Sequence, residues 1–495
     1  MTARAARNPD IVLVNVGGTR KQVYQDLGKV FSAIDTPFWA ALTAGYLRGK
    51  GFDVMILDAN ALNLDLNETV DALAAIGARH IAIVCYSQQA NVSAPIMVAV
   101  GDLCRRIKQR LPETPLILTG WHPSALPERT LREEACDLLV KGEGFRTLAD
   151  LLAGADVADI PGLWRKEGPE VLRGPDAANI RDLTGELPDV AWDLLPMDRY
   201  RAFSWMCLRD FRERTKFASI FTSLGCPFKC SFCAIHATYG EHRIRYWNPE
   251  WVLRQIDILV NRYGVKHINI HDELFVFDPR HYLPIAEGIL ERGYDLNINA
   301  FARVDVLDRV DPGHLDTLKK AGFHWLKLGI ETGSTRIRAN VGKDHYGIDA
   351  VRNAVGKAHG AGIDFCANFM FGLPGDDYGS MQDTLNLALE LMPAFPSFFC
   401  AMAIPGSDLY SEALEKKLPL PDTWLGYASQ GYDFLPLPTE HLTAAQVVEF
   451  RDYAFDAYFR NPAYLNMIER KFGREAMAHI REMTAIKLKR KILGD

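Results

Sequence analysis

The stretch FASIFTSLGCPFKCSFCAIH, residues 217–236, decides how this 495-residue chain folds. It opens on an apolar run that predicts a buried strand, and then enters a loop with Cys226, Cys230 and Cys233. Further strand-like segments follow at 265–271, 294–302, 323–331, 365–372 and 395–402, with helix-like segments between them. Six strand–helix units without a reversal predict a partial (β/α)6, TIM-like barrel over residues 211–405, with its active site at the carboxyl ends of the strands.

Three cysteines in one short loop indicate a metal centre. A cubane iron–sulfur cluster has four irons and takes thiolate ligands, so three thiolates leave one iron open to a small molecule. Zinc is the alternative, with His236 as a fourth ligand, although structural zinc usually takes two separated pairs of ligands. The other six cysteines stand singly, which does not fit a disulfide framework.

Residues 1–155 alternate between apolar strand-like runs and helix-like stretches. Strands are predicted at 11–16, 54–59, 80–86, 115–120 and 137–144. Continuous apolar strands alternating with helices predict a parallel, doubly wound, Rossmann-like α/β domain. NVGGTR stands after the first strand, so the dinucleotide fingerprint GxGxxG is absent.

The remaining segments have weaker patterns. Residues 156–210, rich in Pro, Gly and Asp, predict a linker that contains a hairpin at 162–174. Residues 406–495 predict a small, mostly helical C-terminal region, whose clearest helices are 446–462 and the basic segment 485–493. We expect the basic segment to form a solvated helix face, with membrane contact as the minor alternative. We expect residues 420–460 to cover the barrel mouth, where Tyr427, Gln430 and Tyr432 either contact substrate or simply pack.

Charge and hydropathy exclude several classes of protein. The formal net charge of −6 is small for this length and argues against nucleic acid as a partner. The start of the chain lacks a signal-peptide pattern, and no window approaches the ~18 apolar residues of a spanning helix. We therefore expect a cytoplasmic protein without a membrane span.

By its CxxxCxxC loop after a barrel's first strand, and by the order of the segments around it, the chain resembles the radical S-adenosylmethionine superfamily. The resemblance covers almost the whole chain and matches the branch with an N-terminal cobalamin-binding domain. It implies a [4Fe–4S] cluster on the catalytic Cys226, Cys230 and Cys233, with S-adenosylmethionine and cobalamin as further cofactors.

The resemblance also implies an S-adenosylmethionine site built from residues at the strand ends. These are Phe232 beside the adenine, Asp272 and Glu273 (with His271) near the amino group, Arg303 at the carboxylate or ribose, Glu331 as a further acid, and Gly372 and Pro374 along the adenosine. Strand ends rich in Gly, Pro and Asp are also ordinary turns, and Arg303 could simply pair with Asp305.

For cobalamin, the resemblance is carried by the segment DTPFWAALTAGYLRGKGFDVMILDAN at 35–60 and by two later loops. The positions that it implies around the corrin are Asn15, Thr19, Ser87, Gln88, Gly120, His122, Gly142 and Glu143. The chain departs from cobalamin domains of the mutase type, because DxHxxG is missing after the first strand. A histidine ligand to cobalt is therefore doubtful, and His122 is a minor alternative.

The resemblance implies a methyltransferase that acts on an unactivated carbon of a small molecule through a 5′-deoxyadenosyl radical. A radical cyclase or rearrangement enzyme without methyl transfer is the alternative, and a non-catalytic cobalamin or iron–sulfur sensor is the remoter one. An electron donor such as flavodoxin or ferredoxin is implied by the need to reduce the cluster. The sequence does not identify the substrate.

Overall fold

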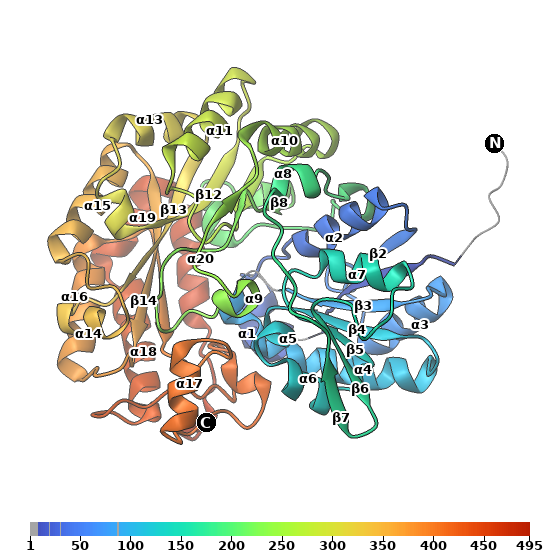
Figure 1. The fold of residues 1–495 in the computed structure, drawn as a ribbon. Helices are drawn as coiled ribbons and strands as arrows, with labels where there is room; N and C mark the ends of the chain where they lie inside the picture. Colours follow the sequence, from blue (N-terminus) through green and yellow to red (C-terminus); the bar gives the residue numbers. More distant parts are fainter. Residues whose placement is uncertain (1–7, 19, 30, 87–88) are drawn as a thin grey trace.

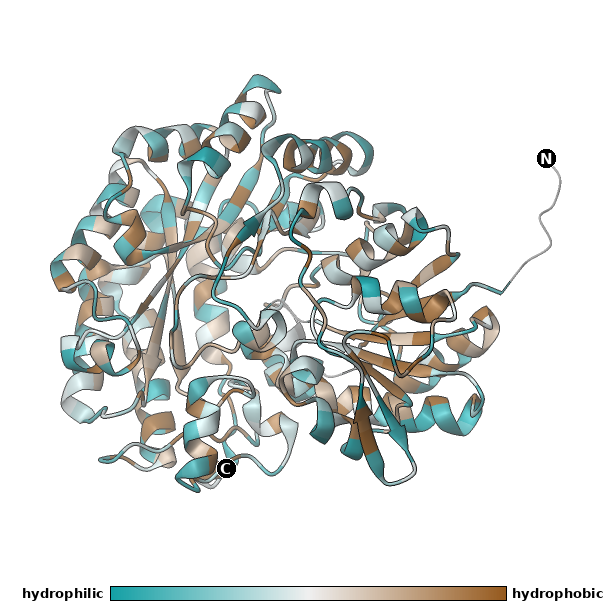
Figure 2. Ribbon diagram, in the orientation of Figure 1, coloured by the Kyte–Doolittle hydropathy of each residue, from teal (hydrophilic) through white to brown (hydrophobic). Residues whose placement is uncertain are grey.

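The computed structural model describes residues 8–18, 20–29, 31–86 and 89–495, which form two α/β lobes and a helical C-terminal region (Figure 1). Each lobe is built around one mainly or wholly parallel sheet. The predicted fold class is therefore confirmed. Figure 2 shows that apolar residues concentrate in the strands of both sheets, where helices cover them.

The first lobe holds a seven-stranded sheet in the order β2-β1-β3-β4-β5-β6-β7. Its parallel strands match the five predicted ones: β1 (Ile11–Asn15), β2 (Val54–Asp58), β3 (Ile81–Cys85), β4 (Leu116–Gly120) and β5 (Leu138–Val140). From β1 the chain first adds β2 on one side of the sheet and then adds β3, β4 and β5 on the other side, so the strand order reverses between β1 and β3. The carboxyl ends of these two strands thus form the switch point where such sheets bind ligands.

The predicted hairpin is β6 (Leu163–Glu167) and β7 (Glu170–Arg173). It does not stand apart in the linker, because β6 pairs with β5 in antiparallel fashion and extends the N-terminal sheet. Leu163 is completely buried there. The first lobe therefore reaches past the boundary that we predicted at residue 155.

Helices cover both faces of the first sheet. They are α1 (Arg20–Tyr24), α2 (Phe38–Gly49), α3 (Leu66–Ile76), α4 (Met97–Arg110), α5 (Trp121–Ala125), α6 (Pro127–Glu133) and α7 (Phe145–Leu152). The start of α3 shows why the sequence sets these bounds. Asp65 accepts hydrogen bonds from the backbone N–H groups of Asn67 and Glu68, and Glu68 bonds back to the N–H of Asp65.

The second lobe is a six-stranded parallel sheet in the order β15-β14-β13-β12-β11-β8, curved into a partial barrel. All six predicted strands are confirmed: β8 (Phe217–Ile220), β11 (His267–Ile270), β12 (Asn297–Arg303), β13 (Phe323–Glu331), β14 (Asp364–Phe371) and β15 (Phe395–Cys400). Among the described residues, β8 and β15 do not pair with each other. The barrel is open between them.

Short elements connect the lobes, and helices surround the barrel. The connection holds α8 (Leu183–Glu186), and the cysteine loop lies beside β9 (Ser223–Leu224), β10 (Arg245–Tyr246) and α9 (His236–Tyr239). The barrel helices are α10 (Pro249–Tyr263), α11 (Pro279–Glu291), α12 (Val304–Leu307), α13 (Pro312–Lys320), α14 (Thr335–Asn340), α15 (Ile348–Gly360) and α16 (Tyr378–Leu391).

The C-terminal region consists of α17 (Asp408–Glu415), α18 (Ala444–Phe459), α19 (Pro462–Phe472) and α20 (Arg474–Ala485). The predicted helix at 485–493 is wrong, because α20 ends at Ala485, residues 486–490 are irregular, and only a single 3-10 turn, Lys491–Leu493, follows them. The side chain of Gln25 bonds both backbone groups of Lys489, at 3.0 and 3.1 Å, in place of helical partners. Arg490 is buried rather than solvated.

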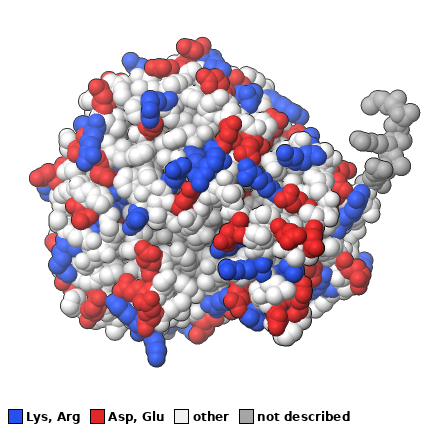
Figure 3. Space-filling view, viewed as in Figure 1, with Lys and Arg blue, Asp and Glu red and all other residues white. Residues whose placement is uncertain are grey.

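Acidic and basic side chains are interspersed over the face of the molecule in Figure 3. Within the described part of the chain, every helix is too short or too polar to cross a lipid bilayer.

Candidate functional site

The cysteine loop leaves the barrel after β9. Gly225 adopts a left-handed conformation (φ 91°) immediately before Cys226, and the carbonyl of Arg243 packs where a side chain would stand. All three cysteines are half-buried. Gly342, in the segment after α14, packs against the Lys229 carbonyl in the same way, so the loop is held from both sides.

Asp272, at the end of β11, anchors the strand from which the loop starts. Its carboxylate accepts hydrogen bonds from the N–H and hydroxyl of Thr222 and from the hydroxyl of Ser223, each at 2.6 Å. The residue is fully buried, and burial raises the pKa of its carboxyl. Because its hydrogen bonds go to Thr222 and Ser223, just before the cysteines, Asp272 holds the loop in place. Its contact with the cosubstrate stays a prediction.

Arg303, at the end of β12, lies against the cysteine loop. Its Nη1 donates to Sγ of Cys230 at 3.4 Å, and its guanidinium carbon lies 3.7 Å from the ring centroid of Phe228. Asp305 fixes the other edge of the guanidinium at 2.9 and 3.2 Å. Arg303 thus contacts Cys230, a predicted cluster ligand, and also pairs with Asp305, as the structural alternative predicted.

Glu273 is the acid with a free carboxylate at this site. No described side chain donates a hydrogen bond to it, and burial together with Asp272 raises its pKa to about 7. Burial also raises the pKa of the Cys226 thiol to about 12 and raises that of Cys233. Iron would displace these protons, because metal ligation requires the thiolate form.

Glu331 ends β13 at a bulge, in the left-handed conformation (φ 64°) that non-glycine residues rarely adopt. Its carboxylate pairs with Lys343 at 2.6 Å, and both side chains are buried. The ammonium of Lys343 also lies 5.7 Å from the ring centroid of Phe232. The sequence prediction missed Lys343, which stands in a loop far from any strand end.

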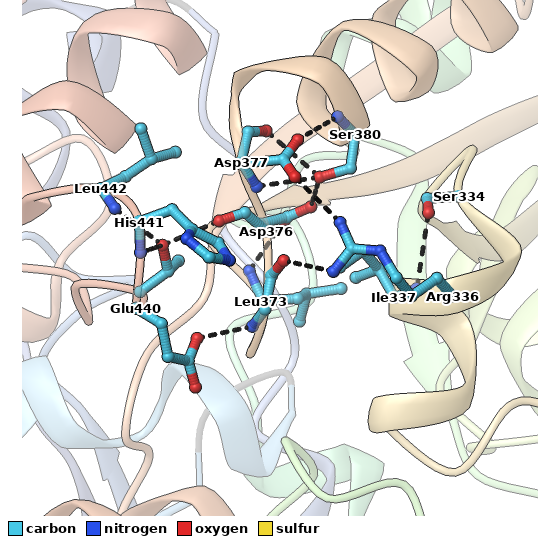
Figure 4. A network of polar contacts seen from close by, with 12 residues as sticks. Ser334, Arg336, Ile337, Leu373, Asp376, Asp377, Ser380, Glu440, His441 and Leu442 are labelled. Carbon is cyan, nitrogen blue, oxygen red and sulfur yellow. Dashed lines mark hydrogen bonds and ion pairs between the residues drawn. The ribbon is translucent and has the colours of Figure 1, made fainter.

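The GLPGDD loop after β14 belongs to a network of polar contacts that also includes residues of α14, α16 and the segment 440–442 (Figure 4). Arg336 donates to the Gly375 carbonyl at 2.8 Å and pairs with Asp377 at 3.0 Å, while Asp376 accepts from Ser380 at 2.6 Å. Gly372 and Pro374 line a small cavity toward α17. The structure therefore places these two residues in a well-ordered turn, and their contact with adenosine stays a prediction.

The loop's chemistry fits an iron–sulfur cluster better than zinc. Each ring nitrogen of His236 lies within hydrogen-bond distance of a backbone carbonyl, to which it can only donate: Nε2 is 2.7 Å from the Phe228 carbonyl and Nδ1 is 3.1 Å from the Glu241 carbonyl. It is thus engaged by the backbone. Among the described residues, no three His, Cys, Asp or Glu side chains gather around the position of a single ion. Three thiolates on one loop, with Arg303 donating to sulfur, suit a larger cluster.

A cavity of about 210 Å³ separates the two lobes at the switch point of the first sheet. Asn15, Trp39 and Tyr86 line it from the first lobe, His271 lines it from the barrel, and residues 427–430 cross its rim. Amide groups beside apolar walls suit an amide-edged corrin. The cavity is smaller than the roughly 300–1,000 Å³ of ordinary ligand pockets.

The other predicted corrin contacts are dispersed. Thr19, Ser87 and Gln88 lie outside the described residues. Gly120 and His122 do not line the cavity; His122 is buried against Trp424, and burial lowers its pKa to about 3. Gly142 and Glu143 line a separate hollow, where Glu143 pairs with Arg245 at 2.6 Å and joins the lobes. Among the predicted corrin contacts that the structure describes, Asn15 is the one that lines the interlobe cavity.

Asp35 and His271 connect the two lobes at this cavity. Oδ2 of Asp35 lies 2.8 Å from Nε2 of His271, and Oδ1 accepts from the hydroxyl of Ser219 on β8. His271 directly precedes Asp272, which anchors the cysteine loop. Sequence reasoning did not identify Asp35, because a lone acid in a loop carries no signal of its distant partner. Tyr427 and Gln430 line this cavity, whereas Tyr432 bonds the carbonyl of Asp495; whether any of the three contacts substrate stays a prediction.

Two family models match the chain: the radical SAM superfamily over residues 220–388 and the B12 binding domain over residues 24–152. An uncharacterized methyltransferase of Pyrococcus horikoshii is 30% identical over 358 residues, which cover 71% of this chain and 73% of the relative. The anaerobic magnesium-protoporphyrin IX monomethyl ester cyclase of Rubrivivax gelatinosus is 23% identical, over 77% of this chain and 66% of the cyclase.

A solved structure shares the fold across both lobes. It is the radical S-adenosylmethionine methyltransferase TsrM from Kitasatospora setae, with cobalamin and a [4Fe–4S] cluster bound. The TM-score is 0.70, the sequences are 16% identical, and the match covers 96% of this chain and 99% of TsrM.

Proposed function

This chain belongs to the radical S-adenosylmethionine superfamily, in the branch with a B12-binding domain, and from this premise we propose that it transfers a methyl group to an unactivated carbon of a small molecule. One observation carries the proposal. The cysteine loop and the switch point of the first sheet lie at the same barrel mouth. Of two adjacent residues there, His271 contacts Asp35 at the switch-point cavity, and Asp272 holds Thr222 at the start of the cysteine loop. An acceptor in the barrel can thus meet both cofactors.

The branch uses a [4Fe–4S] cluster, S-adenosylmethionine and cobalamin, which together supply a 5′-deoxyadenosyl radical and a methyl group. Cys226, Cys230 and Cys233 hold the cluster. Glu273 is the residue that we assign to the amino group of the cosubstrate, since no described side chain donates to its carboxylate and its charge raises the pKa of the Cys226 and Cys233 thiols. Asp272 and Arg303 keep the loop in position over the barrel.

A radical cyclase or rearrangement enzyme is the second candidate, and the cyclase among the relatives favours keeping it. Both reactions form 5′-deoxyadenosine, whereas S-adenosylhomocysteine arises only when cobalamin is remethylated. We also propose an electron donor of the flavodoxin or ferredoxin type, and a cytoplasmic location, because cluster thiolates need a reducing compartment.

The test is anaerobic reconstitution followed by quantification of iron, sulfide and cobalamin, with mass spectrometry of products after reduction. We expect about four irons per chain for one cubane, with release of 5′-deoxyadenosine and S-adenosylhomocysteine. The triple variant Cys226→Ala/Cys230→Ala/Cys233→Ala should lose both products, while Cys104→Ala, in α4 of the first lobe, should keep them. Cobalamin and iron without 5′-deoxyadenosine would instead indicate a sensor.

A further inference from the structure

A second hollow adjoins the interlobe cavity, near the carboxyl ends of β1 and β2. Its volume is about 460 Å³. Arg20, at the start of α1, and Asn60, just after β2, line both this hollow and the interlobe cavity. Arg201, from the segment that connects the lobes, lines the hollow as well. We call it the arginine hollow, after Arg20 and Arg201.

The backbone fixes Arg201 beside the first lobe. Its N–H donates to the Ile34 carbonyl, and its carbonyl accepts from the Ile34 N–H, each at 3.0 Å. The side chain differs, because its Nε is buried and meets no acceptor among the described residues. Buried N–H groups are rarely left without an acceptor, since the unpaired state is costly. The arginine hollow thus contains a donor that is ready for a ligand oxygen.

The charges that line the arginine hollow do not cancel. Arg20, Lys21 and Arg201 are its cations, and Asp65 is its acid. The Asp65 carboxylate already accepts from two backbone N–H groups at the start of α3, at 2.7 and 2.9 Å. Among the described residues, no carboxylate lies within 4.0 Å of the Arg20 or Arg201 guanidinium. The hollow therefore has a net positive charge that attracts anions.

The two guanidiniums act on each other. Burial lowers the pKa of Arg201, and the charge of Arg20 lowers it further. Elsewhere at the junction of the lobes an arginine has its acid, since Arg245 pairs with Glu143 at 2.6 Å. Two like charges that are held close together without an acid are stabilised by an anion that contacts both.

Asn60 adds a neutral donor to the arginine hollow. Its Oδ1 accepts from Nη2 of Arg20 at 2.9 Å, so the amide presents its Nδ2 in another direction. Guanidinium and amide N–H groups suit a ligand that has several acceptor oxygens and a negative charge. Phosphate is such a ligand, and its oxygens match the fork of a guanidinium.

We propose that Arg20 and Arg201, together with the amide of Asn60, bind a phosphate group beside the interlobe cavity. Two molecules can carry this group: cobalamin, whose nucleotide loop contains a phosphodiester, and a phosphorylated methyl acceptor. The second source depends on the proposed function, whereas the binding of phosphate does not.

Inorganic phosphate is the probe that tests this site. Titration of the cobalamin-free chain, followed by the line width in phosphorus NMR, gives the Kd. Wild type should bind phosphate, and Arg20→Met/Arg201→Met should bind it about tenfold more weakly, because it loses two charge-assisted donors. Arg110→Met/Arg173→Met removes the same charge from two exposed arginines of the first lobe and should match wild type.

Asn60→Asp is a second variant, of nearly the same shape as wild type. Its carboxylate keeps the contact with Arg20 and supplies the negative charge from within, so phosphate binding should again fall about tenfold. Circular dichroism confirms that each variant folds. Undiminished phosphate binding by either variant, or no binding by wild type, overturns the proposal.

Cobalamin and cobinamide, which lacks the nucleotide, identify the source of the phosphate. If cobalamin displaces inorganic phosphate and cobinamide does not, the cofactor's phosphodiester occupies the arginine hollow. If neither displaces it, the group arrives on the acceptor.

The two proposals fail separately. Phosphate binding requires neither the cluster nor S-adenosylmethionine, so a reduced protein that forms no 5′-deoxyadenosine would overturn the proposed function and leave the phosphate site standing. Formation of 5′-deoxyadenosine by a protein that binds no phosphate would overturn the site alone.

Discussion

Arg303 donates an N–H···S hydrogen bond of 3.4 Å to Cys230, while Asp305 and the ring of Phe228 hold its guanidinium in place. A cation bonded to a ligand sulfur stabilises the more negative, reduced form of an iron–sulfur cluster. The position that the sequence suggested for cosubstrate binding is thus also placed to adjust the cluster.

We therefore predict that Arg303→Gln lowers the midpoint potential of the cluster. A loss of about 1.4 kcal/mol in the reduced state corresponds to ~59 mV for one electron. The measurement is a redox titration followed by electron paramagnetic resonance. Arg309→Gln, at an exposed residue nearby, is the control; an equal potential in all three proteins would show that Arg303 does not act on the cluster.

Replacing Asp272 should detach the cysteine loop. Asp272→Ala leaves the hydroxyls of Thr222 and Ser223 and one backbone N–H without their buried partner, so we expect a loss of about 3 kcal/mol or more in unfolding free energy. Urea denaturation measures that loss, and iron per chain after reconstitution should fall with it. Asp422→Ala, at an exposed position, should change neither quantity.

Lys327 should make stability depend on pH. Burial lowers its pKa from 10.5 to about 7, although Asp35, Glu273 and Asp272 act in the opposite direction. Between those pH values the unfolded chain holds more protons, so the destabilisation by Lys327 is complete below about pH 7 and fades as pH rises, by up to ~1.4 kcal/mol per unit. Below the lower value it stays constant.

The comparison of Lys327→Met with wild type tests this sign. Thermal denaturation should show that the variant gains most at about pH 6.5 and that its advantage shrinks toward about pH 9.5. If the difference in stability between the variant and wild type stays constant across this pH range, Lys327 does not titrate within it and the prediction is wrong.

Arg490 should control the rim of the interlobe cavity. Its buried guanidinium donates to the Ser429 carbonyl at 2.7 Å and pairs with Asp452 at 3.2 Å, and Ser429 lines that cavity. Arg490→Met should cost about 3 kcal/mol in stability, because it breaks a buried pair, and should release cobalamin about tenfold faster. Absorbance-monitored dissociation measures the release, and Lys491→Met, its exposed neighbour, should match wild type.

The strands were predictable because their signal is local. Apolar runs such as 217–220 and 323–331 are buried at every position or nearly so, which periodicity alone reveals. The cysteine triplet was predictable for the same reason, since its ligands are close in sequence.

What the sequence did not reveal depends on distant partners. Segment 485–493 has helical composition, yet Gln25 and the carbonyls of Ser429 and Gly431 hold it in another conformation. Glu143 follows a strand as a ligand contact would, but Arg245 of the second lobe engages it. Lys327 stood within a predicted strand, where nothing showed that its buried ammonium would reach Asn269 of β11.

The contact between Asp35 and His271 bears on protein engineering. A chimera that takes the barrel from one homologue and the first lobe from another would separate the two halves of this contact, even if each part folded correctly. Because the next residue, Asp272, anchors the cysteine loop, such a graft would disturb the iron site through a mismatch at the seam. Exchanging the loop around residue 35 together with the barrel should restore it.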